Sequence, residues 1–139
     1  MKAIKNGIVF SPDGFVEKID VILQEGKILG MAHCLSSFDG EVIDAKGGYV
    51  LPGFIDIHMH GIAGHDIMEG TDESILAMIG VLPEHGVTSF LPTTVTAPAL
   101  EIRQALSIIS KYHMQHTGGA VILGCHLEGP FINPKYKGA

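Results

Sequence analysis

Strand-like segments alternate with helix-like segments between residues 54 and 126, and this alternation limits the possible folds more than any other feature of the chain. Short apolar runs at residues 54–60, 87–91 and 120–126 have the length and composition of buried strands. The two longer segments between them carry apolar residues at helical spacing. A β-α-β-α-β order joins parallel strands through right-handed crossovers. The sequence therefore predicts an α/β fold with a parallel sheet.

Both predicted helices have recognisable ends. Thr71 is the expected N-cap of the first helix, and Gly86 is expected to end it. Pro98 suits the first position of the second helix, which Gly118-Gly119 would end. The residues expected to face the core are Ile75, Leu76, Ile79 and Leu82 on the first helix, and Ile102, Ala105, Leu106, Ile109 and Tyr112 on the second.

Residues 1–50 show a different pattern, with short strands separated by turns. Ser-Pro-Asp-Gly at residues 11–14 and Glu-Gly-Lys at residues 25–27 favour turns. The segments expected to be strands are residues 3–10, 15–23, 28–31 and 41–44. We therefore expect a small β-domain in residues 1–50.

The second part, residues 51–139, is too short to form a complete barrel. An eight-stranded (β/α) barrel needs about 250 residues. We expect residues 51–139 to form the start of such a barrel, with its first three strands and two helices. The chain would then be a part of a longer protein.

The composition excludes several classes of partner. Nine Lys and Arg residues against fifteen Asp and Glu residues give a formal net charge of −6, which argues against a nucleic-acid partner. No apolar run approaches the roughly 20 residues that span a bilayer, and no basic amphipathic stretch indicates membrane binding. The short apolar stretch near the start does not suit a secretory signal, so we expect a cytoplasmic protein. Cys34 and Cys125 are then expected to be reduced thiols and not a disulfide.

Two histidines at the end of the first strand of this second part are the first candidates for metal binding. Asp56, His58 and His60 share one face of the strand, because side chains alternate, and the apolar residues between them face the other way. In barrels of this kind, active sites lie at the C-terminal ends of the strands. Neighbouring imidazoles there can chelate a divalent ion, although a bare His-x-His pair also occurs in ordinary surface turns. Asp56 is a candidate to orient one of the ligands by a hydrogen bond.

Glu128 is the third candidate ligand, because it follows the third predicted strand and shares a face with His126. A His/His/Glu set suits Zn, Fe, Co or Mn without selecting among them. A surface glutamate before a Gly-Pro turn is the alternative interpretation. The presence of His58 and His60 at the C-terminal end of another strand favours the metal site.

Other polar residues are weaker candidates. Thr93 and Thr94 follow the second strand, where they either approach the site or cap the next helix. His65 lies in the loop after His60, and a solvated position suits it better than contact with substrate. Lys135 and Lys137 could attract an anionic substrate, although exposed loop lysines usually have no specific role.

Several sequence runs resemble the N-acetylglucosamine-6-phosphate deacetylase family of the amidohydrolase superfamily. PGFIDIHMHG at residues 52–61 resembles the first barrel strand of the superfamily. HLEGPFINP at residues 126–134, followed by KGA at residues 137–139, is more specific to the deacetylases. GHDIM at residues 64–68 and GVTSFLPT at residues 86–93 are also similar to that family. The resemblance covers all 139 residues, but only about the first third of such an enzyme.

The resemblance implies a reaction and a set of ligands. Members hydrolyse N-acetylglucosamine 6-phosphate to glucosamine 6-phosphate and acetate with one or two divalent ions, and they are usually homodimers. They combine a (β/α)-barrel with a small β-sandwich formed by both ends of the chain, so residues 1–50 would contribute the N-terminal part of that sandwich. His58 and His60 match the metal-binding pair of binuclear members, and Glu128 matches the glutamate ligand of both types. Ala139 matches a residue that contacts substrate through its backbone.

The resemblance also implies that much of the site lies beyond residue 139. The family's general-base aspartate, its remaining metal-binding histidines and most phosphate contacts belong to later strands. We therefore expect no catalytic residue within this chain and no activity from the chain alone.

Two alternatives remain open. One is another amidohydrolase, such as a cyclic-amide hydrolase or an adenine deaminase, in several of which a modified lysine on the fourth strand bridges two metals. A glutamate after the third strand, in the bridging position, favours the deacetylase. The other alternative is a non-catalytic fragment whose sites are vestigial.

Overall fold

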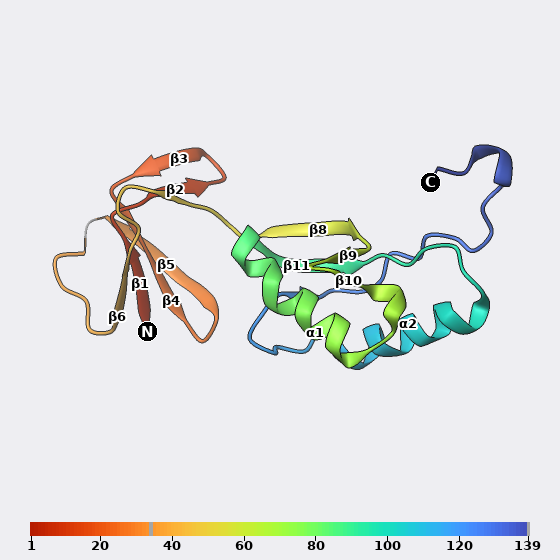
Figure 1. The fold of residues 1–139 in the computed structure, drawn as a ribbon. Coiled ribbons are helices and arrows are strands. Elements are labelled where there is room, and N and C mark those ends of the chain that lie inside the picture. Colours follow the sequence, from red (N-terminus) through yellow and green to blue (C-terminus); the bar gives the residue numbers. More distant parts are fainter. Residues whose placement is uncertain (34, 139) are drawn as a thin grey trace. The chain divides into compact units, whose positions relative to one another are not determined.

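The computed structural model describes residues 1–33 and 35–138, and only the backbone of Glu17. The predictions for Cys34 and Ala139 lie outside the described residues. The chain divides into two compact units, Met1–Pro52 and Gly53–Ala139 (Figure 1). The domain boundary expected from the sequence, after residue 50, lies two residues before this division.

The first unit contains two small sheets. One has the strand order β5-β4-β1-β6, with β1 antiparallel to β4 and parallel to β6. The other has the order β3-β2-β7. The buried apolar side chains of this first unit are Ala3, Val9 and Val21. The strands are β1 (Lys2–Lys5), β2 (Ile8–Ser11), β3 (Gly14–Glu17), β4 (Ile19–Gln24), β5 (Lys27–His33), β6 (Glu41–Asp44) and β7 (Tyr49–Val50).

Two of the expected strands are each split in the structure. Residues 3–10 form β1 and β2, and residues 15–23 form β3 and β4, with members of each pair in different sheets. The chain changes sheet at Asn6 and at Lys18, whose φ angles of 58° and 60° interrupt the extended backbone. Local propensity favours a continuous strand in both places, so the split reflects tertiary pairing.

The predicted turns in this unit are confirmed. Ser11 pairs with Gly14 at the end of the β2–β3 hairpin. Glu25 and Gly26 connect β4 to β5 with φ angles of 50° and 74°. Positive φ at both central residues is the requirement of a type I′ hairpin turn.

The second unit has a parallel sheet with the order β12-β11-β8, and both helices pack against one of its faces (Figure 1). Its buried core brings Phe90 and Ile122 of the sheet together with Ile75 and Ile109 of the helices. None of the described helices is long and apolar enough to cross a membrane. The elements are β8 (Phe54–Met59), β9 (Gly61–Ile62), β10 (His65–Asp66), the 3-10 helix η1 (Ile67–Glu69), α1 (Asp72–Val81), the 3-10 helix η2 (Leu82–His85), β11 (Val87–Pro92), α2 (Ala99–Tyr112), β12 (Val121–Ile122) and the 3-10 helix η3 (Pro134–Tyr136).

The start of α1 follows the prediction, but its buried face differs. Thr71 is the N-cap, and its side chain accepts a hydrogen bond from the Ser74 N–H. Met78 is buried, whereas Leu76 is 41% exposed, so the expected role of Leu76 in the core is wrong. Residues 75, 78, 79 and 82 form one stripe at helical spacing, and position 76 lies outside it.

The second helix and the third strand are both shorter than predicted. Helix α2 ends at Tyr112, because His113 leaves the helix to form a bridge with Ile122. Pro98 is the N-cap and not the first helical residue. Strand β12 covers only Val121–Ile122 of the expected residues 120–126, and the chain rejoins β11 farther on through a bridge between Thr93 and His126.

The segment after β8, expected to be a loop, contains regular secondary structure. Strands β9 and β10 form a small antiparallel hairpin within residues 61–66. A side chain at Gly61 would lie 2.1 Å from the His65 carbonyl oxygen, so the close approach of the strands requires glycine there. This hairpin leads into η1 and then α1.

Candidate metal centre

The C-terminal end of β8 carries the two candidate histidines. His58 lies in the strand, and His60 follows its last residue, Met59. Met59 packs against the helix-covered core. Strand alternation therefore directs both imidazoles to the face opposite the helices.

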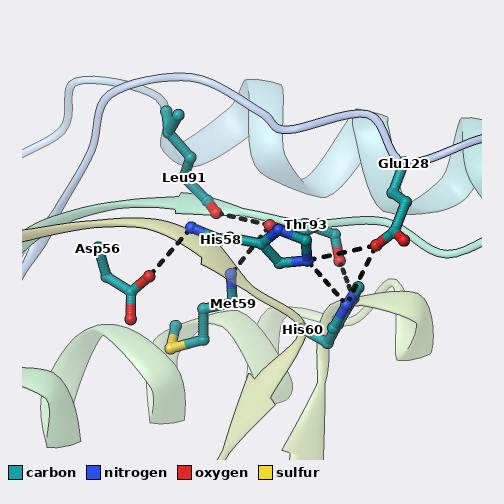
Figure 2. A network of polar contacts seen from close by, with 7 residues as sticks. All are labelled: Asp56, His58, Met59, His60, Leu91, Thr93 and Glu128. Carbon is teal, nitrogen blue, oxygen red and sulfur yellow. Dashed lines mark hydrogen bonds and ion pairs between the residues drawn. The ribbon is translucent and has the colours of Figure 1, made fainter. Parts of the chain in front are cut away.

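Thr93 holds this strand end in place (Figure 2). The Met59 N–H donates to the Thr93 hydroxyl oxygen over 2.9 Å, and the Thr93 N–H donates to the Met59 carbonyl oxygen over 2.8 Å. The Thr93 hydroxyl in turn donates to the Leu91 carbonyl over 3.2 Å. Thr93 and Thr94 are both buried, and neither caps the next helix, whose N-cap is Pro98. Thr93 therefore lies beside the candidate site and does not cap the next helix, which were the two alternatives from the sequence.

The imidazole of His60 is oriented by the same residue. Its Nδ1 lies 2.9 Å from the Thr93 carbonyl oxygen, which can only accept a hydrogen bond. The proton of the neutral ring therefore belongs on Nδ1, and the lone pair belongs on Nε2. A backbone carbonyl commonly fixes metal-binding histidines in this way.

Glu128 reaches the two histidines from the segment that follows β12. The His126 N–H donates to the Pro92 carbonyl over 3.1 Å, and the His126 carbonyl accepts from the Thr94 N–H over 3.1 Å. These bonds fix the chain two residues before Glu128. At Gly129, an added Cβ would lie 2.2 Å from Thr96 Oγ1, so the loop after Glu128 passes too close for a side chain.

The three side chains form a nearly regular triangle of ligand atoms (Figure 2). His58 Nε2 and His60 Nε2 are 3.3 Å apart, and each lies 3.3 Å from Glu128 Oε2. An ion bound tetrahedrally at about 2.1 Å from each ligand would separate them by about 3.4 Å. The spacing and the nitrogen and oxygen donors therefore fit a divalent ion such as Zn, Fe, Co or Mn.

The polarity of these atoms also favours a cation. The Nε2 lone pair of His60 and the carboxylate oxygen of Glu128 are both acceptors, so they do not satisfy each other. A positive charge between them would be attracted to both. The group is half exposed, with 49% of the His58 side chain, 37% of the His60 side chain and 40% of the Glu128 side chain accessible, so an ion can reach it.

A cavity of about 510 Å³ adjoins the triangle. A cavity of this size is in the range of small-molecule sites. His60 and Glu128 contribute the ligand side of its lining. The remaining lining residues are Val95, Thr96, Ile132, Pro134, Lys137 and Gly138.

Two other sequence candidates have local structural roles. Asp56 Oδ1 accepts a hydrogen bond from the backbone N–H of His58 over 3.0 Å and makes no contact with its ring. His65 Nδ1 lies 3.3 Å from Glu69 Oε2, within the capping box that begins η1. The backbone N–H of Asp66, and then the His65 side chain, hold the pKa of Glu69 below its ordinary value.

Sequence reasoning missed two contributions to this site. One is the Thr93 carbonyl, which orients His60 but leaves no mark in the residue type. The other is the ring of His126, whose centroid lies 4.5 Å from that of His58. The His-Leu-Glu spacing placed His126 and Glu128 on one face, and this was the feature of the sequence that could have indicated His126 as a neighbour of the site. Cys125, next to His126, is a free thiol whose pKa is raised by burial.

Comparisons with known proteins indicate the family that this chain resembles. Residues 41–89 match the family described as "Amidohydrolase family". The chain is 40% identical over 114 residues to the N-acetylglucosamine-6-phosphate deacetylase of Vibrio furnissii, a match that covers 79% of this chain and 29% of that protein. It is 38% identical over 141 residues to the deacetylase of the same name from Bacillus subtilis strain 168, covering 99% of this chain and 33% of that protein.

A solved structure extends the similarity to the fold. The crystal structure of N-acetylglucosamine-6-phosphate deacetylase from Thermotoga maritima superposes with a TM-score of 0.78 at 31% identity, over 99% of this chain and 34% of that one. The chain thus spans about a third of the length of these relatives. Its residues 41–89 match the amidohydrolase family, and nearly the whole chain is similar to the N-acetylglucosamine-6-phosphate deacetylases.

Proposed function

We propose that this chain is part of a longer metal-dependent hydrolase that converts N-acetylglucosamine 6-phosphate into glucosamine 6-phosphate and acetate. The observation that carries the proposal is the triangle formed by His58, His60 and Glu128 beside a cavity of small-molecule size. The similarity of nearly the whole chain to deacetylases of this substrate supports the choice of reaction.

The proposal includes an architecture for the longer protein. Residues 51–139 would begin a (β/α)-barrel, which the three parallel strands and the helices on one face support. Residues 1–50 would contribute to a small β-sandwich, which the two sheets of the first unit support. A cytoplasmic homodimer completes the proposal and rests on the family resemblance.

The residues of this chain would hold one or two divalent ions and one side of the substrate. A bound divalent ion supplies Lewis-acid polarisation of a carbonyl and a water more acidic than bulk water. Thr93 fixes the tautomer of His60, so that its Nε2 lone pair is available to the ion. Glu128 contributes the negative charge that balances the cation.

Proton transfer is the part of the reaction that this chain does not supply. Among the described residues that line the cavity, Glu128 is the sole carboxylate, and we assign it to the metal. A second group is needed to take a proton from water and give it to the leaving amine. We propose that this group lies outside residues 1–139, as the family resemblance implies.

The test uses the longest natural protein that contains this sequence. We expect it to release acetate from N-acetylglucosamine 6-phosphate, to lose activity with a chelator and to regain it with one of Zn, Fe, Co or Mn. The competing substrates are N-acetylgalactosamine 6-phosphate, which is the C4 epimer of N-acetylglucosamine 6-phosphate, and a cyclic amide. Faster turnover of the cyclic amide would instead support a cyclic-amide hydrolase, and no turnover of any amide would support the non-catalytic alternative.

Lys137 provides a prediction about substrate affinity. It lines the cavity together with Glu128, whereas Lys135 lies against the Tyr136 ring, 5.5 Å from its centroid, and does not line it. Lys137→Gln should raise the KM for the anionic substrate about tenfold, equivalent to about 1.4 kcal/mol, and change kcat less, because the charge is remote from the reacting bond.

Lys135→Gln is the matched control, since it removes the same charge two residues away. Steady-state kinetics of both variants in the longer protein would measure the difference. Equal changes in KM would assign the effect to overall charge and exclude a specific contact by Lys137.

A further inference from the structure

His126 is a half-buried histidine that the proposed reaction does not use. Its backbone is held by the two hydrogen bonds described above, one with Pro92 at the end of β11 and one with Thr94 just after it. Its ring centroid lies 4.5 Å from that of His58, with an angle of 84° between the ring planes. This is an edge-to-face arrangement, which aromatic rings prefer over a face-to-face stack.

The two histidines of the triangle are held in different ways. His60 has a hydrogen-bond acceptor for Nδ1, the Thr93 carbonyl. Within residues 1–33 and 35–138, the ring of His58 has no such acceptor. Its polar ring contacts are those of Nε2 with His60 and Glu128, and its remaining close ring neighbour is His126.

An unheld histidine ring has a broad choice of orientation, because the χ2 torsion of histidine has no narrow staggered minima. Rotation about χ2 would move Nε2 of His58 away from Glu128. A ring packed edge-to-face against it restricts this rotation. The backbone hydrogen bonds of His126 with Pro92 and Thr94 fix the position from which its ring packs against His58.

We propose that His126 is a positioning residue that fixes the ring of His58, and so keeps its Nε2 directed at the metal position. The proposal rests on the metal centre proposed above, but its mechanism is the contact between two rings. The contact requires a flat ring at position 126 and not a nitrogen ligand. A phenylalanine at position 126 should therefore still position the His58 ring, whereas an alanine should not.

The first experiment measures the Zn²⁺ affinity of the longer protein by competition with a chromophoric chelator. Loss of a partner that orients a metal ligand typically weakens affinity 10–100-fold. We expect His126→Ala to weaken Zn²⁺ binding about tenfold, and His126→Phe to bind within about twofold of the unsubstituted protein. His116→Ala is the control for loss of an exposed histidine, and it should leave affinity unchanged.

Two results would overturn the proposal. Affinity of His126→Phe as weak as that of His126→Ala would show that a nitrogen of His126 is needed, as a ligand or as a hydrogen-bonding group. Unchanged affinity of His126→Ala would show that the ring has no influence on the centre.

The second experiment needs no metal, so it separates this inference from the proposed function. In the metal-free longer protein, NMR should show nuclear Overhauser contacts between the ring protons of His58 and His126. In His126→Phe the His58 ring should keep its contacts to position 126, and in His126→Ala it should show averaged orientations. Absence of the contact in the unsubstituted protein would refute the positioning role, even if the protein bound Zn²⁺. A contact without Zn²⁺ binding would instead count against the metal centre.

Discussion

Glu128→Gln should remove most of the bound metal and most of the activity from the longer protein. The substitution keeps the size of the side chain but replaces a charged ligand with a neutral amide. Two imidazoles would then remain to hold a divalent cation without a balancing negative charge on this chain. Because Glu128 is a direct ligand in the proposed centre, we expect a loss of affinity of at least about 100-fold, the upper end of the loss typical for outer partners.

Metal content after dialysis and the rate of acetate release measure this effect together. Glu84→Gln is the control, because it removes the same charge from an exposed side chain in η2. Circular dichroism of both variants checks that the fold is retained. Unchanged metal content and unchanged rate in Glu128→Gln would remove Glu128 from the site.

Residue spacing and position in the sequence were enough to predict that His58, His60 and Glu128 lie close together. Strand alternation placed His58 and His60 on one face, and Glu128 was placed after the end of the third predicted strand. In a parallel sheet, these ends lie on the same edge. The structure brings the three ligand atoms together as expected, with 3.3 Å between them. Their binding of metal stays a prediction.

The contacts that orient the ligands could not be anticipated, because they depend on register. Strands β8 and β11 pair with two irregularities, between Val87 and Ser89 and between Phe90 and Pro92. The second irregularity brings Thr93 opposite the end of β8, where its carbonyl meets His60. Residue types alone do not determine such a shift, so the role of the Thr93 backbone was not visible in the sequence.

The errors in the fold have a similar cause. Local patterns identified the turns at residues 11–14 and 25–27 but not the changes of sheet at Asn6 and Lys18. Helix α2 ends early because a bridge from His113 to Ile122 competes with the helix. In both cases a pairing partner distant in sequence decided the local conformation.

Phe90→Ala should cause the largest loss of stability in the second unit. The Phe90 side chain is fully buried in the core, between the sheet and both helices. Truncation of a buried phenylalanine costs about 3–5 kcal/mol, through lost burial and the cavity that remains. Since whole domains are stable by only about 5–15 kcal/mol, this loss should lower the urea midpoint substantially.

Phe131→Ala is the matched control, because Phe131 is 99% exposed and the same atoms are removed. Its free energy of unfolding should change by less than about 0.5 kcal/mol. Urea unfolding followed by circular dichroism gives the midpoints, and hydrogen exchange of the β11 amides assigns the effect to the second unit. Equal midpoints for the two variants would show that Phe90 is not part of a packed core.

The same substitution should also affect the metal centre without touching it. Phe90 lies in β11 three residues before Thr93, and its carbonyl accepts the Leu123 N–H over 3.1 Å. Loosening this strand would loosen both the Thr93 carbonyl that orients His60 and the backbone that anchors His126. Metal affinity in Phe90→Ala should therefore fall together with stability, whereas Glu128→Gln should lower affinity with the fold intact. Measuring both quantities in both variants separates the framework of the site from its ligands.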